Sequence, residues 1–414
     1  MTKTIKKETR TKSHQKEDYQ KTSIGEVPSD WEVKQIGDIA FIDQENLSGA
    51  IPKNYSFNYI SISDIEEGQM VSEPQKIEYK NAPSRAKRLV REGDILMATV
   101  RPNRKGIFII RYDEKDLVAS TGFAVISCTD CSNEFLYQFL FSTKITKQVS
   151  QIIAGSNYPA ITSQDVKKLK IPLPSLPEQR RIAEILSTWD RAIERTQRLI
   201  DALEKRKKGL MQQLLTGKVR LKGFSGEWKF VQAGELFENI SKKNIDGPLL
   251  SVTQENGVIP RHLLESKVTM PEGSTSSFKL VEKGNFIISL RSFQGGLENS
   301  KYRGLVSPAY TVLQAKKDIC DGYYKFYFKT YHFIGHLASA VIGIRDGKQV
   351  SYEEFCRVKI PYPSLEEQQN IANLLNQVIK EINCENIRLV HLKDQKKGLM
   401  QQLLTGKKRI NYKD

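Results

Sequence analysis

Two long stretches of this chain carry apolar residues at helical intervals, with charged and polar residues between them. Each stretch holds about 40 residues, which at about 1.5 Å per residue gives a helix about 60 Å long. Residues 175–178 and 364–367 have the Ser-x-x-Glu spacing of a capping box, and Gly217 and Gly406 are the expected helix stops. Helices this long need a partner along their apolar side. The predicted apolar stripes are Ile182, Ile185, Trp189, Ala192, Leu199, Leu203 and Leu210, and Ile371, Leu374, Val378, Ile382, Leu389, Leu392 and Leu399.

The segments before these helices show a different pattern, with short apolar runs separated by turn residues. Residues 59–63, 94–100, 106–110 and 123–127 read as strands, and residues 134–142 as a helix. This is the pattern of a mixed, strand-rich globular domain. Trp31 and Trp228 share a place in the two halves, which favours core packing for both side chains.

The chain is internally duplicated. The twelve residues Lys207–Lys218 return unchanged as Lys396–Lys407, and Lys170–Gln179 resembles Lys359–Gln368 at the same offset. The chain order is therefore domain, helix, domain, helix. We expect the helices to pack antiparallel as a coiled coil and the molecule to have a pseudo-twofold axis. The alternative is that both helices belong to one compact core.

The predicted fold class is α/β (α+β), with two globular domains separated by two long antiparallel helices. The predicted divisions are a disordered basic tail at 1–22, a first globular domain at 23–170, a first helical spacer at 171–222, a second globular domain at 223–359 and a second helical spacer at 360–414.

The charge of the chain indicates its partner. A net charge of +16 and a pI near 9.4 favour a polyanion, with nucleic acid first and an acidic membrane surface second. No apolar run approaches the roughly 18–20 residues of a membrane span, and the N-terminus lacks the apolar core of a signal peptide. We expect a soluble cytoplasmic protein without a membrane partner.

The cysteines and histidines do not predict a metal site. The five cysteines are scattered, so reduced thiols are expected. Cys128 and Cys131 have zinc-like spacing, but no second pair completes four ligands. His332 and His336 lack the glutamate of a metalloprotease motif, so two ordinary helical histidines are expected.

The chain resembles the specificity subunits of type I restriction-modification systems over residues 23–410. The resemblance rests on the paired openings Ile171–Gln179 and Ile360–Gln368 and on the paired twelve-residue ends. It also rests on Val100-Arg-Pro-Asn103 and Ser120-Thr-Gly-Phe123.

The resemblance implies a subunit without catalysis of its own. In that family each globular part is a target recognition domain that reads one half of a split, asymmetric DNA site, and the helices fix the unread spacer. Two methyltransferase subunits dock on the helices, and restriction/translocase subunits join for cleavage. The resemblance implies no cofactor in this chain, with S-adenosylmethionine, ATP and magnesium held by partner subunits.

Loops rich in Arg, Asn, Gln and Ser are the candidates for contacts with double-stranded DNA, because these side chains read base edges or bind phosphates. The alternative for each of these residues is an ordinary solvent-exposed side chain that does not contact DNA. The candidates are Arg85, Lys87, Arg88, Arg101, Asn103, Arg104, Lys105, Ser156, Asn157 and Tyr158 in the first domain, and Arg291, Ser292, Gln294, Lys301, Arg303, Arg345, Lys348 and Gln349 in the second.

The repeated helix ends are the candidates for docking the methyltransferases, because two such subunits need equivalent sites. We choose Gln212, Gln213, Gln401 and Gln402. The alternative is that these segments pack on each other or on the opposing domain. Three other interpretations stay open: the separate specificity subunit of a related restriction system that cuts on both sides of its site, a coiled-coil adaptor, and an enzyme with a hidden active site.

Overall fold

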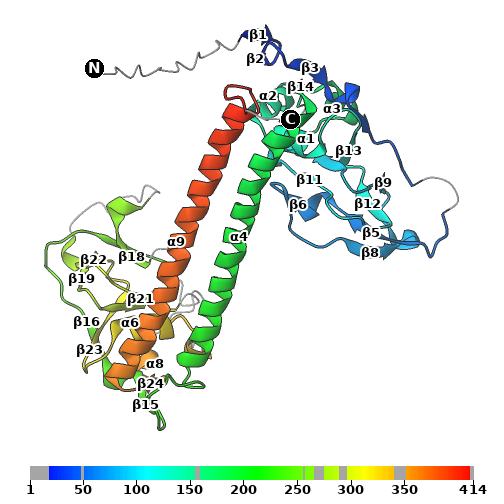
Figure 1. Cartoon of the computed structure of the whole chain (residues 1–414). Coiled ribbons are helices and arrows are strands. Elements are labelled where there is room, and N and C mark those ends of the chain that lie inside the picture. Colours follow the sequence, from blue (N-terminus) through cyan, green and yellow to red (C-terminus); the bar gives the residue numbers. More distant parts are fainter. Residues whose placement is uncertain are drawn as a thin grey trace, which may run out of the picture. The chain divides into compact units, whose positions relative to one another are not determined.

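The computed structural model describes residues 18–47, 51–153, 159–254, 257–264, 275–288, 296–339 and 351–410 (Figure 1). Its contacts divide the chain into two compact units. Unit 1 holds residues 1–195 and 389–414, and unit 2 holds residues 196–388. Unit 1 therefore combines the first globular domain with the first half of the first long helix and the end of the second. Unit 2 combines the second globular domain with the remaining parts of both helices.

The two long helices are α4 (Leu176–Leu214) and α9 (Leu365–Leu403), each of 39 residues, which confirms the predicted lengths. In unit 1, Lys396 Nζ lies 2.5 Å from Asp190 Oδ1. In unit 2, Arg206 Nη1 lies 3.9 Å from Glu381 Oε2. Moving forward along α4 thus means moving backward along α9, so the helices are antiparallel, as predicted (Figure 1).

The ends of the helices follow the sequence signals in part. Gly217 and Gly406 have φ of 71° and 69°, the left-handed conformation of a helix stop. One position of the predicted stripe is wrong, because Leu199 is 44% exposed. Its neighbours Thr196 and Ile200 are buried instead, so the buried side of α4 runs through these two positions.

The globular domain of unit 1 contains two four-stranded sheets, with strand orders β11-β10-β13-β4 and β8-β5-β12-β9. Strand β3 pairs with the last strand of the domain, β14, which ends just before α4 begins. The strands are β1 (Tyr19–Thr22), β2 (Gly25–Pro28), β3 (Glu32–Gln35), β4 (Ala40–Ile42), β5 (Ser56–Ile60), β6 (Ile65–Glu66), β7 (Gln69–Met70), β8 (Gln75–Glu78), β9 (Ala86–Leu89), β10 (Ile95–Ala98), β11 (Ile107–Ile109), β12 (Leu117–Ser120), β13 (Phe123–Cys128) and β14 (Lys170–Leu173). The helices are α1 (Asn133–Leu140), α2 (Thr143–Ile152) and α3 (Ser163–Lys168).

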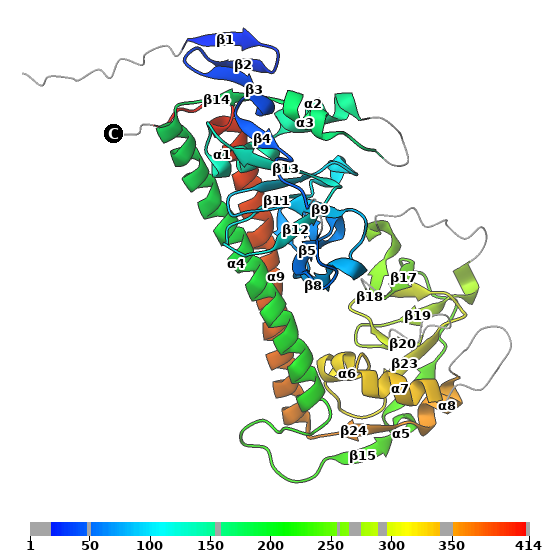
Figure 2. The ribbon, with the colours of Figure 1, turned by 90° about the vertical axis from the view of Figure 1, so that its right-hand side faces the viewer.

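The globular domain of unit 2 has the matching sheet, with strand order β16-β23-β20-β21, and three further strand pairs, β15-β24, β17-β18 and β19-β22. Figure 2 shows α6 and α7 beside β20 and β23. The strands are β15 (Lys229–Gln232), β16 (Phe237–Ile240), β17 (Leu250–Thr253), β18 (Gly257–Pro260), β19 (Lys279–Val281), β20 (Phe286–Ile288), β21 (Glu298–Asn299), β22 (Gly304–Val306), β23 (Thr311–Ala315) and β24 (Lys359–Tyr362). The helices are α5 (Ala233–Leu236), α6 (Asp321–Tyr327), α7 (Tyr331–Ser339) and α8 (Tyr352–Arg357).

The two domains repeat each other down to strand register. Lys170 pairs with Gln35 in unit 1, and Lys359 pairs with Gln232 in unit 2, at the same places of the closing strand pair. Both central sheets also keep the same order of strands. The duplication predicted from short motifs therefore extends through both globular domains.

Each unit has a main apolar core that includes parts of both long helices. Ile182 and Leu186 of α4 and Leu403 of α9 lie in the core of unit 1. Leu214 of α4 and Ile371 of α9 lie in the core of unit 2. A fully buried side chain of this size contributes about 1.5–3 kcal/mol, so these contacts hold each domain on its helix pair.

Two predictions are corrected by the structure. Residues 19–22 of the predicted disordered tail form β1, because they pair with β2 and Tyr19 donates a hydrogen bond to Gly406. Residues 1–17 lie outside the described residues. The strand predicted at 59–63 ends at Ile60, because Ser61 starts a 3-10 turn in which its backbone N–H donates to Asp64.

Candidate nucleic-acid interface

Residues 101–105 of unit 1 form a tight loop with an unusual backbone. Arg101 and Lys105 have φ of 51° and 52°, left-handed values on each side of a 3-10 turn at Pro102–Arg104. Non-glycine residues rarely take this conformation, and it is concentrated at functional sites. The side chains of Asn103 and Arg104 are exposed and those of Arg101 and Lys105 are half-buried.

A second predicted loop meets this one. The Arg101 N–H donates to the Pro159 carbonyl at 2.7 Å, and Val100 forms a β-bridge with Ala160. The candidates Ser156, Asn157 and Tyr158 lie outside the described residues, but the segment that carries them ends beside Arg101. The structure therefore brings the ends of the two candidate loops together.

The candidates around β9 separate into two groups. Arg85, just before β9, and Lys87, on this edge strand of the second sheet, are exposed and accessible to a phosphate. Arg88 binds inside the domain, with Nη2 2.8 Å from Asp43 Oδ2 and Nη1 2.9 Å from Asn46 Oδ1. Its guanidinium is thus occupied by protein groups, which favours a structural role.

In unit 2, Lys301 and Arg303 are exposed between β21 and β22. Arg303 forms a surface ion pair with Glu282 at 3.2 Å, which is weak enough to exchange for a phosphate. The other candidates of this domain, Arg291, Ser292, Gln294, Arg345, Lys348 and Gln349, lie outside the described residues.

Two lysines that the sequence analysis missed lie near Lys301. Lys325 and Lys329 face Glu298, with which Lys329 forms an ion pair. Burial lowers the pKa of Lys325, and the positive charge of Lys301 adds to this shift. These charges create a positive potential beside β21. Lys325 lies in α6 and Lys329 lies two residues beyond its end, and no motif in the sequence marks either of them.

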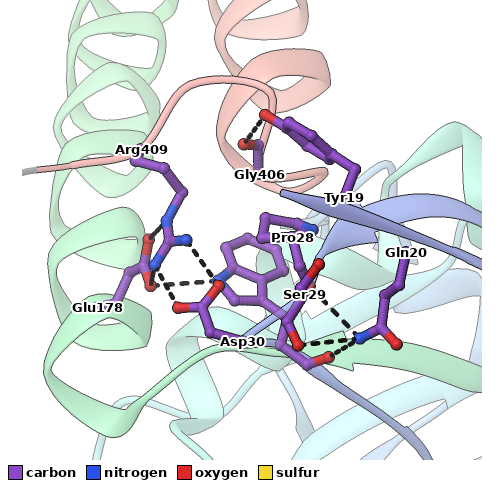
Figure 3. A network of polar contacts seen from close by, with 9 residues as sticks. Tyr19, Gln20, Pro28, Ser29, Asp30, Glu178, Gly406 and Arg409 are labelled. Carbon is purple, nitrogen blue, oxygen red and sulfur yellow. Dashed lines mark hydrogen bonds and ion pairs between the residues drawn. The ribbon is translucent and has the colours of Figure 1, made fainter. Parts of the chain in front are cut away.

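Buried glutamates join each domain to its helices, at positions that the sequence analysis assigned to capping boxes. In unit 1, Arg409 donates to Glu178 at 2.8 and 3.0 Å and to both oxygens of Asp30 at 2.8 Å (Figure 3). Trp31 Nε1 donates to Glu178 at 3.2 Å. We call Asp30, Trp31, Glu178 and Arg409 the unit 1 junction.

Unit 2 contains the equivalent group. Arg220 donates to both oxygens of Glu367 at 2.6 and 2.7 Å, and Trp228 Nε1 donates to Glu367 at 3.0 Å. We call Arg220, Trp228 and Glu367 the unit 2 junction. At the start of α9 the serine contact of the predicted capping box is present, because the Glu367 N–H donates to Ser364 Oγ at 3.3 Å. The Glu367 side chain binds Arg220 and Trp228. The acids instead hold the junctions together.

The repeated helix ends expose the four glutamines chosen as docking candidates. Gln212 and Gln213 lie in the last turn of α4, and Gln401 and Gln402 in the last turn of α9. All four residues are exposed, so both copies are accessible from solvent.

The two cysteines of the first pair lie close to each other, and so do the two histidines of the second pair, but neither pair belongs to a larger cluster of such side chains among the described residues. Cys128 Sγ is 2.9 Å from Cys131 Sγ, and His332 Nε2 is 3.2 Å from His336 Nε2. Within the described residues, no group of three or more His, Cys, Asp or Glu side chains could hold a metal ion. None of the described helices has a stretch long and apolar enough to cross a membrane.

Comparison with known proteins identifies the kind of chain to which this geometry belongs. Residues 28–205 and 225–393 match the family described as type I restriction modification DNA specificity domain. The chain belongs to this family. The resemblance inferred from the paired motifs is therefore confirmed, and the specificity-domain match is repeated once in each half.

Individual members of the specificity-domain family are similar over nearly the whole chain. The putative type I restriction enzyme MjaX specificity subunit of Methanocaldococcus jannaschii is 27% identical over 96% of this chain and 98% of the relative. The MjaVIII specificity subunit of the same organism is 28% identical over 93% and 94%. A solved structure described as the structural basis underlying complex assembly and conformational transition of the type I R-M system has a TM-score of 0.60 at 25% identity, covering 92% of this chain and 99% of that chain.

Proposed function

We propose that this chain is the DNA-recognition subunit of a type I restriction-modification complex, with each globular domain reading one half of a split site. The observation that carries this proposal is the duplication of a complete domain, closing strand pair and helix within a specificity-domain chain. Two similar readers with divergent surface loops suit a site whose two halves differ in sequence.

The reading surface that we propose differs in position between the domains. In unit 1 it is the loop at 101–105 together with Ser156, Asn157 and Tyr158, and Arg85 and Lys87 contact phosphates. In unit 2 it includes Lys301 and Arg303 and extends to Lys325 and Lys329. Phosphate contacts fix the position of a protein on the duplex, and the base contacts select the sequence.

The helices set the spacer between the half-sites. Each helix has 39 residues, hence a length of about 60 Å, against about 34 Å for one turn of duplex. The chain itself carries no catalytic step in this proposal. Two methyltransferase subunits dock at Gln212, Gln213, Gln401 and Gln402, and restriction/translocase subunits join them in the cytoplasm. S-adenosylmethionine, ATP and magnesium belong to those partners.

The test is to express the chain with its methyltransferase in a host that lacks DNA methylation and to map modified adenines across the genome. We expect a motif with two defined halves and a fixed unread gap. No methylation despite a stable complex would overturn the proposal and favour a coiled-coil adaptor, and methyl transfer without a partner would favour an enzyme.

A variant assigns the reading surface. Replacing Asn103 and Arg104 with alanine should remove or relax one half of the motif and leave the other half unchanged, because each lost base contact costs about 1–3 kcal/mol. The control is Lys115→Ala, which removes an exposed charge of unit 1 outside the candidate loops. Loss of both halves in the double variant would contradict the assignment.

A further inference from the structure

The structure assigns a positioning role to the two junctions: each fixes its recognition domain at one angle on the helix pair and thereby enforces the spacer length. This inference rests on the proposed function. It concerns how strictly the gap between the half-sites is kept, which neither the reading loops nor the helix length alone determines.

In unit 2 one carboxylate joins the first turn of α9 to the continuous segment that carries Arg220 and Trp228, and in unit 1 one carboxylate joins three separate segments. In unit 1 they are the loop before β3, the first turn of α4 and the segment after α9, which supply Trp31, Glu178 and Arg409 (Figure 3). The domain and both helices thus share a single buried group. Any rotation of the domain on the helices breaks hydrogen bonds to that carboxylate.

The contacts are directional and protected from water. The side chains of Glu178 and Glu367 are each 1% exposed. Arg409 and Arg220 bind them as planar forks, and their guanidinium groups lie 5.7 and 5.4 Å from the Trp31 and Trp228 ring centroids. A bidentate arginine–carboxylate pair fixes an angle as well as a distance.

The apolar cores do not provide this precision. Ile182 and Leu403 join the unit 1 core to the helices, but the hydrophobic effect is non-directional. Apolar side chains in a core can slide by a small distance and stay buried. The arginine and glutamate of a junction cannot rotate relative to each other without losing hydrogen bonds. We therefore separate the two contributions: the cores give the stability, and the junctions give the angle.

The recurrence of the group in both halves supports a selected role. Arg220 and Arg409 lie beyond the identical twelve residues, and the residues just before them, Val219 and Lys408, differ. In unit 2 one continuous segment runs from the end of α4 to Trp228, whereas in unit 1 the end of α9 and Trp31 lie far apart in the sequence. The same three side-chain types nevertheless meet in both units.

A fixed angle matters because of the geometry of DNA. Changing the gap by one base pair moves a half-site by about 3.4 Å and turns it by about 35° around the duplex. A domain that could rotate on its helices would follow that turn and accept the altered site. A domain held by the junction rejects it.

The experiment uses the full chain in complex with its methyltransferase and the variants Arg409→Lys and Arg220→Lys. Lysine keeps the charge and removes the fork. Arg111→Lys is the matched control, because Arg111 binds Glu134 as a fork within unit 1 but does not join the helices. Modified adenines are mapped genome-wide, and methylation is scored separately for each gap length between intact half-sites.

We expect the junction variants to keep both half-sites and to methylate sites with gaps one base pair longer or shorter. Relative to sites with the normal gap, this methylation should rise about fivefold or more, which corresponds to losing the penalty of one mismatched position. The control variant should keep the normal gap.

Two results would overturn the inference. An equal loss of methylation at every site, with the gap unchanged, would show that the junctions only stabilise the fold. Unchanged methylation would show that they do not matter for reading. If Arg409→Lys fails to assemble, Arg220→Lys decides, since it removes the equivalent fork on Glu367 in unit 2. A wild-type chain without a split motif would instead remove the proposed function itself.

Discussion

The two junctions contain the same arginine, glutamate and tryptophan, but they are completed differently. In unit 2 a continuous segment leads from the end of α4 at Leu214 to Trp228, and Arg220 also donates to the Gly226 carbonyl. In unit 1 the corresponding segments are 18–31 and 404–410, which are far apart in sequence. There Asp30 supplies a second carboxylate to Arg409.

The hairpin of β1 and β2 adds to this difference. Tyr19 donates to the Gly406 carbonyl at 3.0 Å, and Gln20 donates to the Trp31 carbonyl at 2.8 Å (Figure 3). Side-chain contacts in unit 1 therefore take the place that a peptide connection has in unit 2. The comparison teaches that the same arrangement of arginine, glutamate and tryptophan is held in two ways, by a continuous segment in unit 2 and by side-chain hydrogen bonds between separate segments in unit 1.

Removing the buried acids should have the largest effect. We expect Glu178→Ala and Glu367→Ala to destabilise their units by about 3–5 kcal/mol, because each removes the charge-assisted hydrogen bonds of a half-buried arginine and the acceptor of an indole N–H. The loss should be smaller in unit 1, where Arg409 keeps Asp30. Hydrogen exchange of peptides from the first turns of α4 and α9 measures both values.

The control for this pair is Glu184→Ala, which removes an exposed acid that binds Arg181 on the surface of α4. We expect a change below about 1 kcal/mol. Equal losses for Glu178→Ala and Glu367→Ala would show that Asp30 does not compensate, and the comparison would then depend on the hairpin alone.

Gly406→Ala should have the next largest effect and should exceed Gly217→Ala. Both glycines are left-handed, which costs another residue about 1–2 kcal/mol. A Cβ on Gly406 would also lie 2.3 Å from Cγ of Pro28, a rigid ring, whereas one on Gly217 would lie 2.9 Å from Trp228 Cε3. We expect about 2–4 kcal/mol at Gly406, measured by urea unfolding with hydrogen exchange to assign the unit.

The same twelve-residue repeat offers the controls. Gly209 and Gly398 lie inside the helices, and a Cβ there would meet no atom within 4 Å among the described residues. Alanine at either position should stabilise the chain by about 0.5–1 kcal/mol, because glycine is a poor helix residue. A loss at these positions would mean that the glycine effect at 406 is not specific to the junction.

Much of the fold could be predicted because the signals are local. Helix periodicity, the serines at 175 and 364 and the glycines at 217 and 406 determine α4 and α9, and the repeat predicts a second copy. The junctions could not be predicted in the same way. Asp30, Glu178 and Arg409 meet only after the domain has folded, so no sequence spacing brings them together.

A weaker signal for the junctions was nevertheless present. Arg220 and Arg409 have the same offset as the repeats although their preceding residues differ, and Trp31 and Trp228 each follow an acid. The proposed DNA-reading residues were harder to choose from the sequence. Arg88 looked like a phosphate contact because it follows Arg85 and Lys87, but a strand alternates its side chains, and Arg88 is bound to Asp43.

Asp30→Asn should have the smallest effect and should depend on pH. The hydrogen bonds from Arg409 lower the pKa of Asp30 below its usual value of 3.8. A carboxylate with a lowered folded-state pKa stabilises the fold above its unfolded pKa, and this contribution is lost as pH falls through the folded value. Since Asp30 is mostly exposed, we expect the variant to lose less than about 1 kcal/mol at neutral pH.

The difference between wild type and Asp30→Asn should therefore be constant from neutral pH down to about pH 5 and should disappear as the pH falls through 4 toward the lowered pKa of Asp30. Exchange rates of a peptide covering 404–410 report it directly. The control is Glu227→Gln, at the matching place before Trp228, where Arg220 binds the Gly226 carbonyl instead. A pH-dependent change of equal size at Glu227 would show that both junctions use this acid, and the difference between the two units would then lie only in how the chain connects them.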